Sequence, residues 1–108
     1  MEMGELQRVL RLLPVFVTVA ETEQVTVAAA ILRMPQPTVS RALSTLAEII
    51  GTPLVERQGR GIVLTAAGRE LLPYARAGLD AVATGVAMVA RDQVVGQGEV
   101  PIAFQTVL

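Results

Sequence analysis

Short polar side chains and one arginine share one face of a segment that begins near residue 36. Glutamine, threonine and serine can all donate and accept hydrogen bonds, and arginine can bind guanine or phosphate through two N–H groups at once. The members of this polar face are Gln36, Thr38, Ser40, Arg41 and Ser44. Bulky apolar groups would not fit the donor and acceptor edges of the major groove of duplex DNA, whereas these side chains do. The face is therefore a candidate for base contacts, and backbone N–H groups at its N-terminal end are expected to attract phosphate.

The polar face belongs to a predicted helix from Pro37 to about Ile50, with Gly51 as its stop signal. The apolar stripe on its other side consists of Val39, Leu43, Leu46 and Ile50. This spacing predicts that the stripe packs on a core while the polar residues stay outside. An ordinary amphipathic helix with a solvated polar face has the same pattern, and the pattern alone does not separate the two interpretations.

A predicted hairpin follows this helix, with strand-like pieces at 54–57 and 62–64. The turn at 58–61 is glycine-rich and carries an arginine between two glycines. Such a tip packs poorly and reaches outward easily. We therefore expect Arg57 and Arg60 to contact phosphate or the minor groove, which favours the DNA-contact interpretation of the preceding helix.

Two helices are predicted before the polar one. The first covers residues 6–21, and its expected core-facing residues are Leu6, Leu10, Leu13, Val17 and Ala20. Pro14 either starts this helix or kinks it. The second runs from Val27 to about Leu32, with Thr26 as its expected N-cap.

A long fourth helix is predicted from Ala66 to about Val94, capped by Thr65. Apolar residues recur in it at alternating steps of three and four, namely Leu72, Ala75, Leu79, Val82, Val86 and Val89. This is the spacing of a coiled-coil seam, and it predicts a parallel or antiparallel partner helix. The alternative is that the helix packs back on its own domain.

The composition excludes several classes of function. The 108 residues suit one compact domain and contain neither cysteine nor histidine, so disulfides and histidine-based catalysis are excluded. There is no phosphate-binding loop and no paired carboxylate pattern, so we expect no enzyme activity, no metal site and no cofactor. The N-terminus lacks the basic start of a signal peptide and no apolar run approaches a span, so we expect a cytoplasmic protein that does not enter a membrane.

Charge and hydropathy point to partners. The net charge is −1, yet residues 33–69 contain five arginines against two glutamates, a local charge of +3. The mean hydropathy of +0.53 is high for a monomer and predicts that a partner covers part of the surface.

Taken in order, these motifs resemble the LysR-type transcriptional regulators over about residues 13–98. The most specific stretch is 36–43, followed by the sequences at 53–57, 59–61, 64–65 and 67–68. The resemblance implies a winged helix-turn-helix whose third helix enters the major groove and whose long linker helix pairs two subunits. In that family the positions that match Gln36, Pro37, Thr38, Ser40 and Arg41 meet DNA. The position of Thr26 touches phosphate, and that of Arg60 reaches the minor groove.

The resemblance also implies a domain organisation. Residues 1–65 would form the DNA-binding domain and 66–95 the dimerisation helix. Residues 96–108 would form a hinge and the start of a domain that senses a small-molecule effector. Full-length members of the family can assemble further into tetramers.

The sequence departs from the family pattern at two positions. Pro35 replaces the usual serine or threonine, so a helix cap and a phosphate contact should both be missing. Val55 stands where the family often has phenylalanine.

We therefore predict a mainly α fold with a small two-stranded wing and a long C-terminal dimerisation helix. As a dimer it would bind double-stranded DNA at an inverted-repeat operator and regulate transcription. The alternative is a helical dimerisation or protein-interaction module without affinity for DNA.

Overall fold

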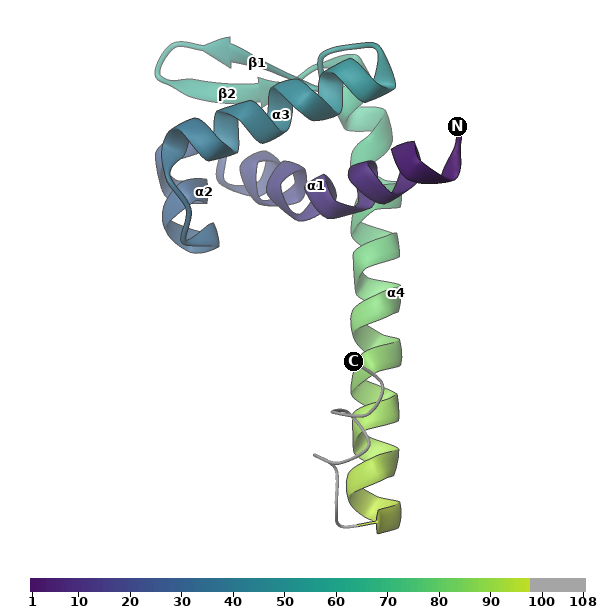
Figure 1. Cartoon of the computed structure of the whole chain (residues 1–108). Helices are drawn as coiled ribbons and strands as arrows, with labels where there is room; N and C mark the ends of the chain where they lie inside the picture. The colour runs from purple at the N-terminus through teal and green to yellow at the C-terminus, as the bar shows by residue number, and fades with distance from the viewer. Residues whose placement is uncertain (98–108) are drawn as a thin grey trace. The chain divides into compact units, whose positions relative to one another are not determined.

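The computed structural model describes residues 1–97 of the chain, and the side chains of residues 1–93. Its elements are α1 (Met3–Thr22), α2 (Val25–Leu32), α3 (Gln36–Ile50), β1 (Val55–Gln58), β2 (Gly61–Leu64) and α4 (Ala66–Gln97), as Figure 1 shows. The mainly helical fold with a small two-stranded wing is thus confirmed. The part of the predicted hinge beyond residue 97 lies outside the described residues.

The chain divides into two units, which are described separately. Residues 1–76 form the first compact unit, and the second begins at Ala77 with the distal part of α4. The first unit contains α1, α2, α3, the wing and the opening turns of α4. None of the helices within residues 1–97 is both long and apolar enough to cross a membrane.

The core of the first unit is made where α1 packs against α2 and α3. Its largest fully buried side chains are Phe16, Val19, Val39 and Leu46. The predicted apolar stripe of α3 is confirmed, because Val39, Leu43 and Leu46 are buried and Ile50 is half-buried. Burying this stripe fixes the rotation of α3 about its axis, so its polar face must point outward.

The predicted core face of α1 is partly wrong. Leu6 and Leu10 are 39% and 53% exposed. The buried residues of this helix are Val9, Leu13, Val15, Phe16 and Val19. Because α1 carries apolar residues on more than one side, its own periodicity allowed two faces, and the packing of α2 and α3 selected one of them.

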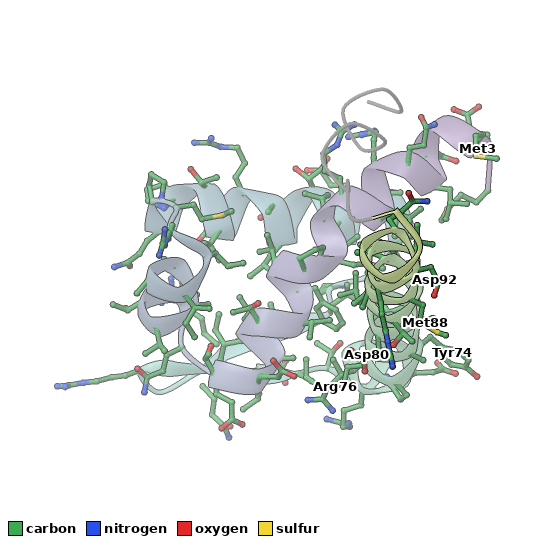
Figure 2. All side chains as sticks on the ribbon, turned by 90° about the horizontal axis from the view of Figure 1, so that it is seen from below. Met3, Tyr74, Arg76, Asp80, Met88 and Asp92 are labelled. Atoms are coloured by element: carbon green, nitrogen blue, oxygen red, sulfur yellow. The ribbon has the colours of Figure 1, made fainter. Side chains whose placement is uncertain are left out.

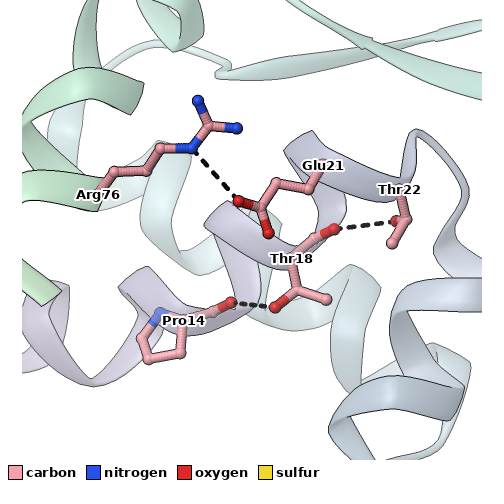
Figure 3. A network of polar contacts seen from close by, with 5 residues as sticks. All are labelled: Pro14, Thr18, Glu21, Thr22 and Arg76. Carbon is pink, nitrogen blue, oxygen red and sulfur yellow. Dashed lines mark hydrogen bonds and ion pairs between the residues drawn. The ribbon is translucent and has the colours of Figure 1, made fainter. Parts of the chain in front are cut away.

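Pro14 lies inside α1, which runs through it from Met3 to Thr22. The Thr18 hydroxyl donates to the carbonyl oxygen of Pro14 at 2.8 Å, and the Thr22 hydroxyl donates to that of Thr18 at 2.9 Å. Figure 3 shows this chain of contacts beside the ion pair of Arg76 with Glu21, whose Nε–Oε2 distance is 3.3 Å. Both side chains of the pair are about half exposed, so it adds little stability.

The end of α2 is fixed by its backbone. Arg33 has a left-handed conformation with a φ of 55° and donates its N–H to the Ala30 carbonyl at 3.3 Å. Met34 donates its N–H to the Ala29 carbonyl at 3.1 Å, which completes a Schellman motif. At the other end the helix follows Gln24 and no side chain caps it, so the prediction of Thr26 as N-cap is wrong.

The wing is an antiparallel hairpin in which Val55 pairs with Leu64 and Gln58 with Gly61. Its base is tied to the turn between α1 and α2, because the Ile62 N–H donates to the Glu23 carbonyl at 2.9 Å. A Cβ atom at position 61 would lie 2.9 Å from the same carbonyl oxygen, so glycine permits this close approach. The wing therefore has a fixed base beside the helix-turn-helix.

Thr65 caps α4, as predicted. Its hydroxyl accepts a hydrogen bond from the Gly68 N–H at 3.1 Å and donates one to the Pro53 carbonyl at 2.7 Å. Its N–H donates to the Leu54 carbonyl at 3.0 Å. One residue thus begins α4 and joins it to the segment that leads into the wing.

Candidate nucleic-acid interface

The outward face of α3 collects most of the predicted contact residues. The exposed members are Gln36, Pro37, Thr38, Ser40, Arg41 and Ser44. They share this face because the apolar stripe opposite them is buried in the first unit. None of these side chains donates or accepts a protein hydrogen bond within the described residues, so their polar groups remain available to a ligand.

The backbone at the start of α3 offers fewer free N–H donors than an ordinary helix N-terminus. Pro35 is the N-cap residue and makes no side-chain cap, which confirms the expected loss of the cap. Pro35 and Pro37 have no N–H, and the N–H groups of Thr38 and Val39 both donate to the Pro35 carbonyl, at 3.0 and 3.2 Å. Gln36 therefore carries the one uncommitted N–H of residues 35–39, so an anion at this helix end would depend mainly on side-chain donors.

A shallow hollow between α2 and α3 brings three polar side chains together. Thr26 and Gln36 were predicted contact residues, and both line it. Arg33, which was not among the predicted contact residues, lines the same hollow. The sequence feature that could have indicated Arg33 is its place in the short turn between the two helices. None of the three residues of this turn, Arg33, Met34 and Pro35, carries a hydroxyl group.

A second hollow joins α3 to the wing, and in Figure 1 the hairpin runs alongside this helix. Ser40 and Ser44 line it from α3, and Glu56 and Arg57 line it from β1. Arg60 is exposed at the wing tip, next to Gly59, whose φ is 60°. The structure thus brings two serines and Arg57 to one hollow, with Arg60 further out at the tip of the hairpin.

The arginines of this region are not neutralised by the protein. Within residues 1–93 the one ion pair is that of Arg76 with Glu21, on α4 and α1. Arg33, Arg41, Arg57 and Arg60 are exposed and remain available for an anion. Glu56 borders the hollow beside Arg57, so this mainly basic face also carries a carboxylate. Among the described residues no acidic cluster could hold a metal ion.

The sequence model of the family described as "Bacterial regulatory helix-turn-helix protein, lysR family" matches residues 10–69, which contain most of α1, all of α2 and α3, and the wing. The chain belongs to the LysR family. The match is consistent with the resemblance described above, and it starts after the first two turns of α1.

Curated relatives are similar over about the same region. A probable hydrogen peroxide-inducible genes activator of Mycobacterium xenopi is 46% identical over 67 residues, which are 62% of this chain and 35% of the relative. The RuBisCO operon transcriptional regulator of Allochromatium vinosum is 47% identical over 68 residues, 63% of this chain and 22% of the relative. The chain thus spans about a third or less of the length of these relatives.

Solved structures of the LysR family have the same fold. The BenM DBD in complex with benA site 1 DNA is 36% identical, with a TM-score of 0.71 over 84% of this chain and 98% of that one. The CbnR DBD in complex with DNA is 33% identical, with a TM-score of 0.69 over 90% of this chain and all of that one. The fold is therefore that of winged helix DNA-binding domains of LysR regulators.

The predicted seam of α4 has two parts. Leu72 is half-buried and Ala75 is 1% exposed, both within the first unit. In the second unit Leu79 is half-buried, while Val82, Val86 and Val89 are exposed. Figure 2 shows the side chain of Met88 projecting from the α4 ribbon, and it too is exposed. The accessible apolar surface of α4 thus lies mainly beyond residue 79.

Proposed function

We propose that this chain is the DNA-binding part of a LysR-type transcription regulator and that it binds duplex DNA. The observation that carries the proposal is the exposed polar face of α3, flanked by arginines that form no ion pair within residues 1–93. On this proposal α3 enters the major groove, where Gln36, Ser40 and Arg41 meet base edges. Arg57 and Arg60 contact phosphates or the minor groove from the wing. No catalytic step and no cofactor is part of the proposal.

Fluorescence anisotropy of a labelled duplex pool tests this proposal at about 50 and 200 mM salt. Neutralised phosphates release counterions, so the affinity of this chain should fall steeply between the two salt concentrations. Absence of binding at both concentrations would contradict the proposal and favour the protein-interaction alternative. If the chain binds, selection from the same pool gives its preferred half-site, which is the duplex used to compare variants.

We further propose that two copies pair through α4 and read an inverted repeat. The support is the exposed apolar row at Val82, Val86 and Val89, which has the spacing of a coiled-coil seam. Such a row is costly in water, and a two-fold pair of helices would cover it.

Replacing Val86 with alanine is expected to weaken the dimer. The substitution removes apolar surface from both copies and should cost about 1 kcal/mol per subunit, so the dimer dissociation constant should rise by about tenfold or more. Sedimentation equilibrium over a concentration series measures this constant. Thr84→Ala is the matched control, because Thr84 is exposed and lies on the opposite side of the heptad. An equal effect of both substitutions would argue against the seam.

A further inference from the structure

We infer that Arg33, at the end of α2, binds a DNA backbone phosphate beside the start of α3 and thereby positions α3 on the duplex. The inference rests on the proposed binding of duplex DNA and adds a residue and a role to it. It follows from three observations, which are the hollow between α2 and α3, the donors that two prolines remove, and the fixed backbone of Arg33.

The hollow places Arg33 next to the predicted contact residues. Thr26 comes from the first turn of α2, Gln36 from the first turn of α3, and Arg33 from the turn between them. Arg33 is the one charged residue among the described residues that line this hollow. Its side chain is exposed and makes no ion pair within residues 1–93. A threonine hydroxyl, a glutamine amide and a guanidinium together form a donor set suited to a phosphate.

Apart from the uncommitted N–H of Gln36, the backbone at residues 35–39 offers no further donor to this hollow. Pro35 and Pro37 have no N–H and no hydroxyl, and the N–H groups of Thr38 and Val39 already bind the Pro35 carbonyl. The neutral groups that remain in the hollow carry no charge to release counterions from DNA. A guanidinium supplies both the charge and two parallel donors.

The backbone of Arg33 holds the base of its side chain in place. The Schellman motif fixes this residue through the N–H groups of Arg33 and Met34. Its positive φ would be less strained for glycine, so the arginine is kept here at a cost in conformation. Glu23 has a similar conformation at the end of α1, so strain alone does not identify a contact. The hollow and the missing donors are the additional reasons for assigning a phosphate contact to Arg33.

Arg33→Ala tests the inference when binding is measured by anisotropy across a salt series. The slope of the logarithm of affinity against the logarithm of salt concentration should fall in magnitude by about 0.9, the value of one phosphate. Affinity should fall about tenfold, and equally for the selected half-site and for an unrelated duplex, because phosphate carries no sequence information. Arg8→Ala is the matched control, since Arg8 is exposed on α1 outside the hollow. This control should leave the slope unchanged.

Two further variants separate the contact from an effect on folding. Arg33→Gly relieves the positive φ, so its melting temperature should not fall, yet its salt slope should fall as in Arg33→Ala. Pro35→Ser in the Arg33→Ala background introduces a hydroxyl beside the hollow and should recover part of the lost affinity.

The outcomes distinguish the two proposals. If the unaltered chain binds with a steep salt slope and Arg33→Ala has the same slope, the inference is wrong while the proposed function stands. A loss confined to the selected half-site would also overturn it, since that pattern indicates a base contact. If the unaltered chain shows no salt-dependent binding to either duplex, the proposed function itself fails.

Discussion

Replacing Gly68 with alanine is expected to destabilise the compact unit by about 3 kcal/mol, a large part of the stability of a small domain. A Cβ atom at this position would overlap the carbonyl oxygen of Leu54 and would lie 3.2 Å from Cδ2 of Leu64. The Leu54 carbonyl cannot move away freely, because it accepts the N–H of Thr65 and its own side chain is buried. The first turn of α4 would have to shift away from the segment that leads into the wing.

Thermal unfolding followed by circular dichroism measures this effect. A loss of this size should lower the melting temperature by on the order of 12 °C or more. Gly4→Ala is the control, because Gly4 is also helical and its added Cβ atom would meet only the end of the Glu2 side chain, at 3.5 Å. That variant should unfold at the same temperature or higher, since alanine favours helix over glycine. Equal melting temperatures for Gly68→Ala and the unaltered chain would contradict the close approach of α4 to Leu54.

Replacing Arg41 with alanine is expected to weaken binding to the selected half-site by about 30-fold, which corresponds to about 2 kcal/mol. Arg41 is exposed on the polar face of α3, and its position is set by the buried neighbours Val39 and Leu43. A guanidinium that contacts guanine loses two hydrogen bonds at once when it is removed. Arg41→Lys should recover only part of the affinity, because an ammonium group lacks the planar pair of donors.

The comparison of two duplexes identifies the kind of contact. For a base contact, Arg41→Ala should weaken the selected half-site much more than an unrelated duplex, in contrast to the uniform loss expected for Arg33→Ala. Arg8→Ala again serves as the control for the loss of one positive charge. Unchanged affinity of Arg41→Ala at the selected half-site would count against α3 as the helix that enters the groove.

Local patterns in the sequence were sufficient wherever one short segment controls the outcome. The apolar stripe of α3 and its stop at Gly51, whose φ is 95°, are both confirmed. Thr65 caps α4 as predicted, since an N-cap depends on residues only three positions apart. Pro35 was expected to remove a cap, and the structure has no side-chain cap there. The helix ends at Gly51, Thr65 and Pro35 depend on interactions within about one helical turn, so tertiary packing had little influence on them.

Predictions from the sequence were insufficient where more than one helix face or position fits the same pattern. Leu6 and Leu10 fit the helical spacing of a core face, but α2 and α3 pack against a different side of α1. Thr26 is a good capping residue by type, yet α2 begins two residues earlier, with Gln24 as its N-cap. Ala75 has the right spacing for the predicted seam, but it is already buried within the first unit.

The sequence by itself determined the helical elements, the wing, the polar face of α3 and the family. Only the tertiary structure placed Arg33 beside Thr26 and Gln36, and only it showed that Gly68 meets the Leu54 carbonyl. Helical periodicity describes the faces of one element at a time, whereas a contact between two elements depends on how both are rotated and how closely they approach. The residues that could contact DNA could therefore be proposed from the sequence, but their grouping into hollows required the packed chain.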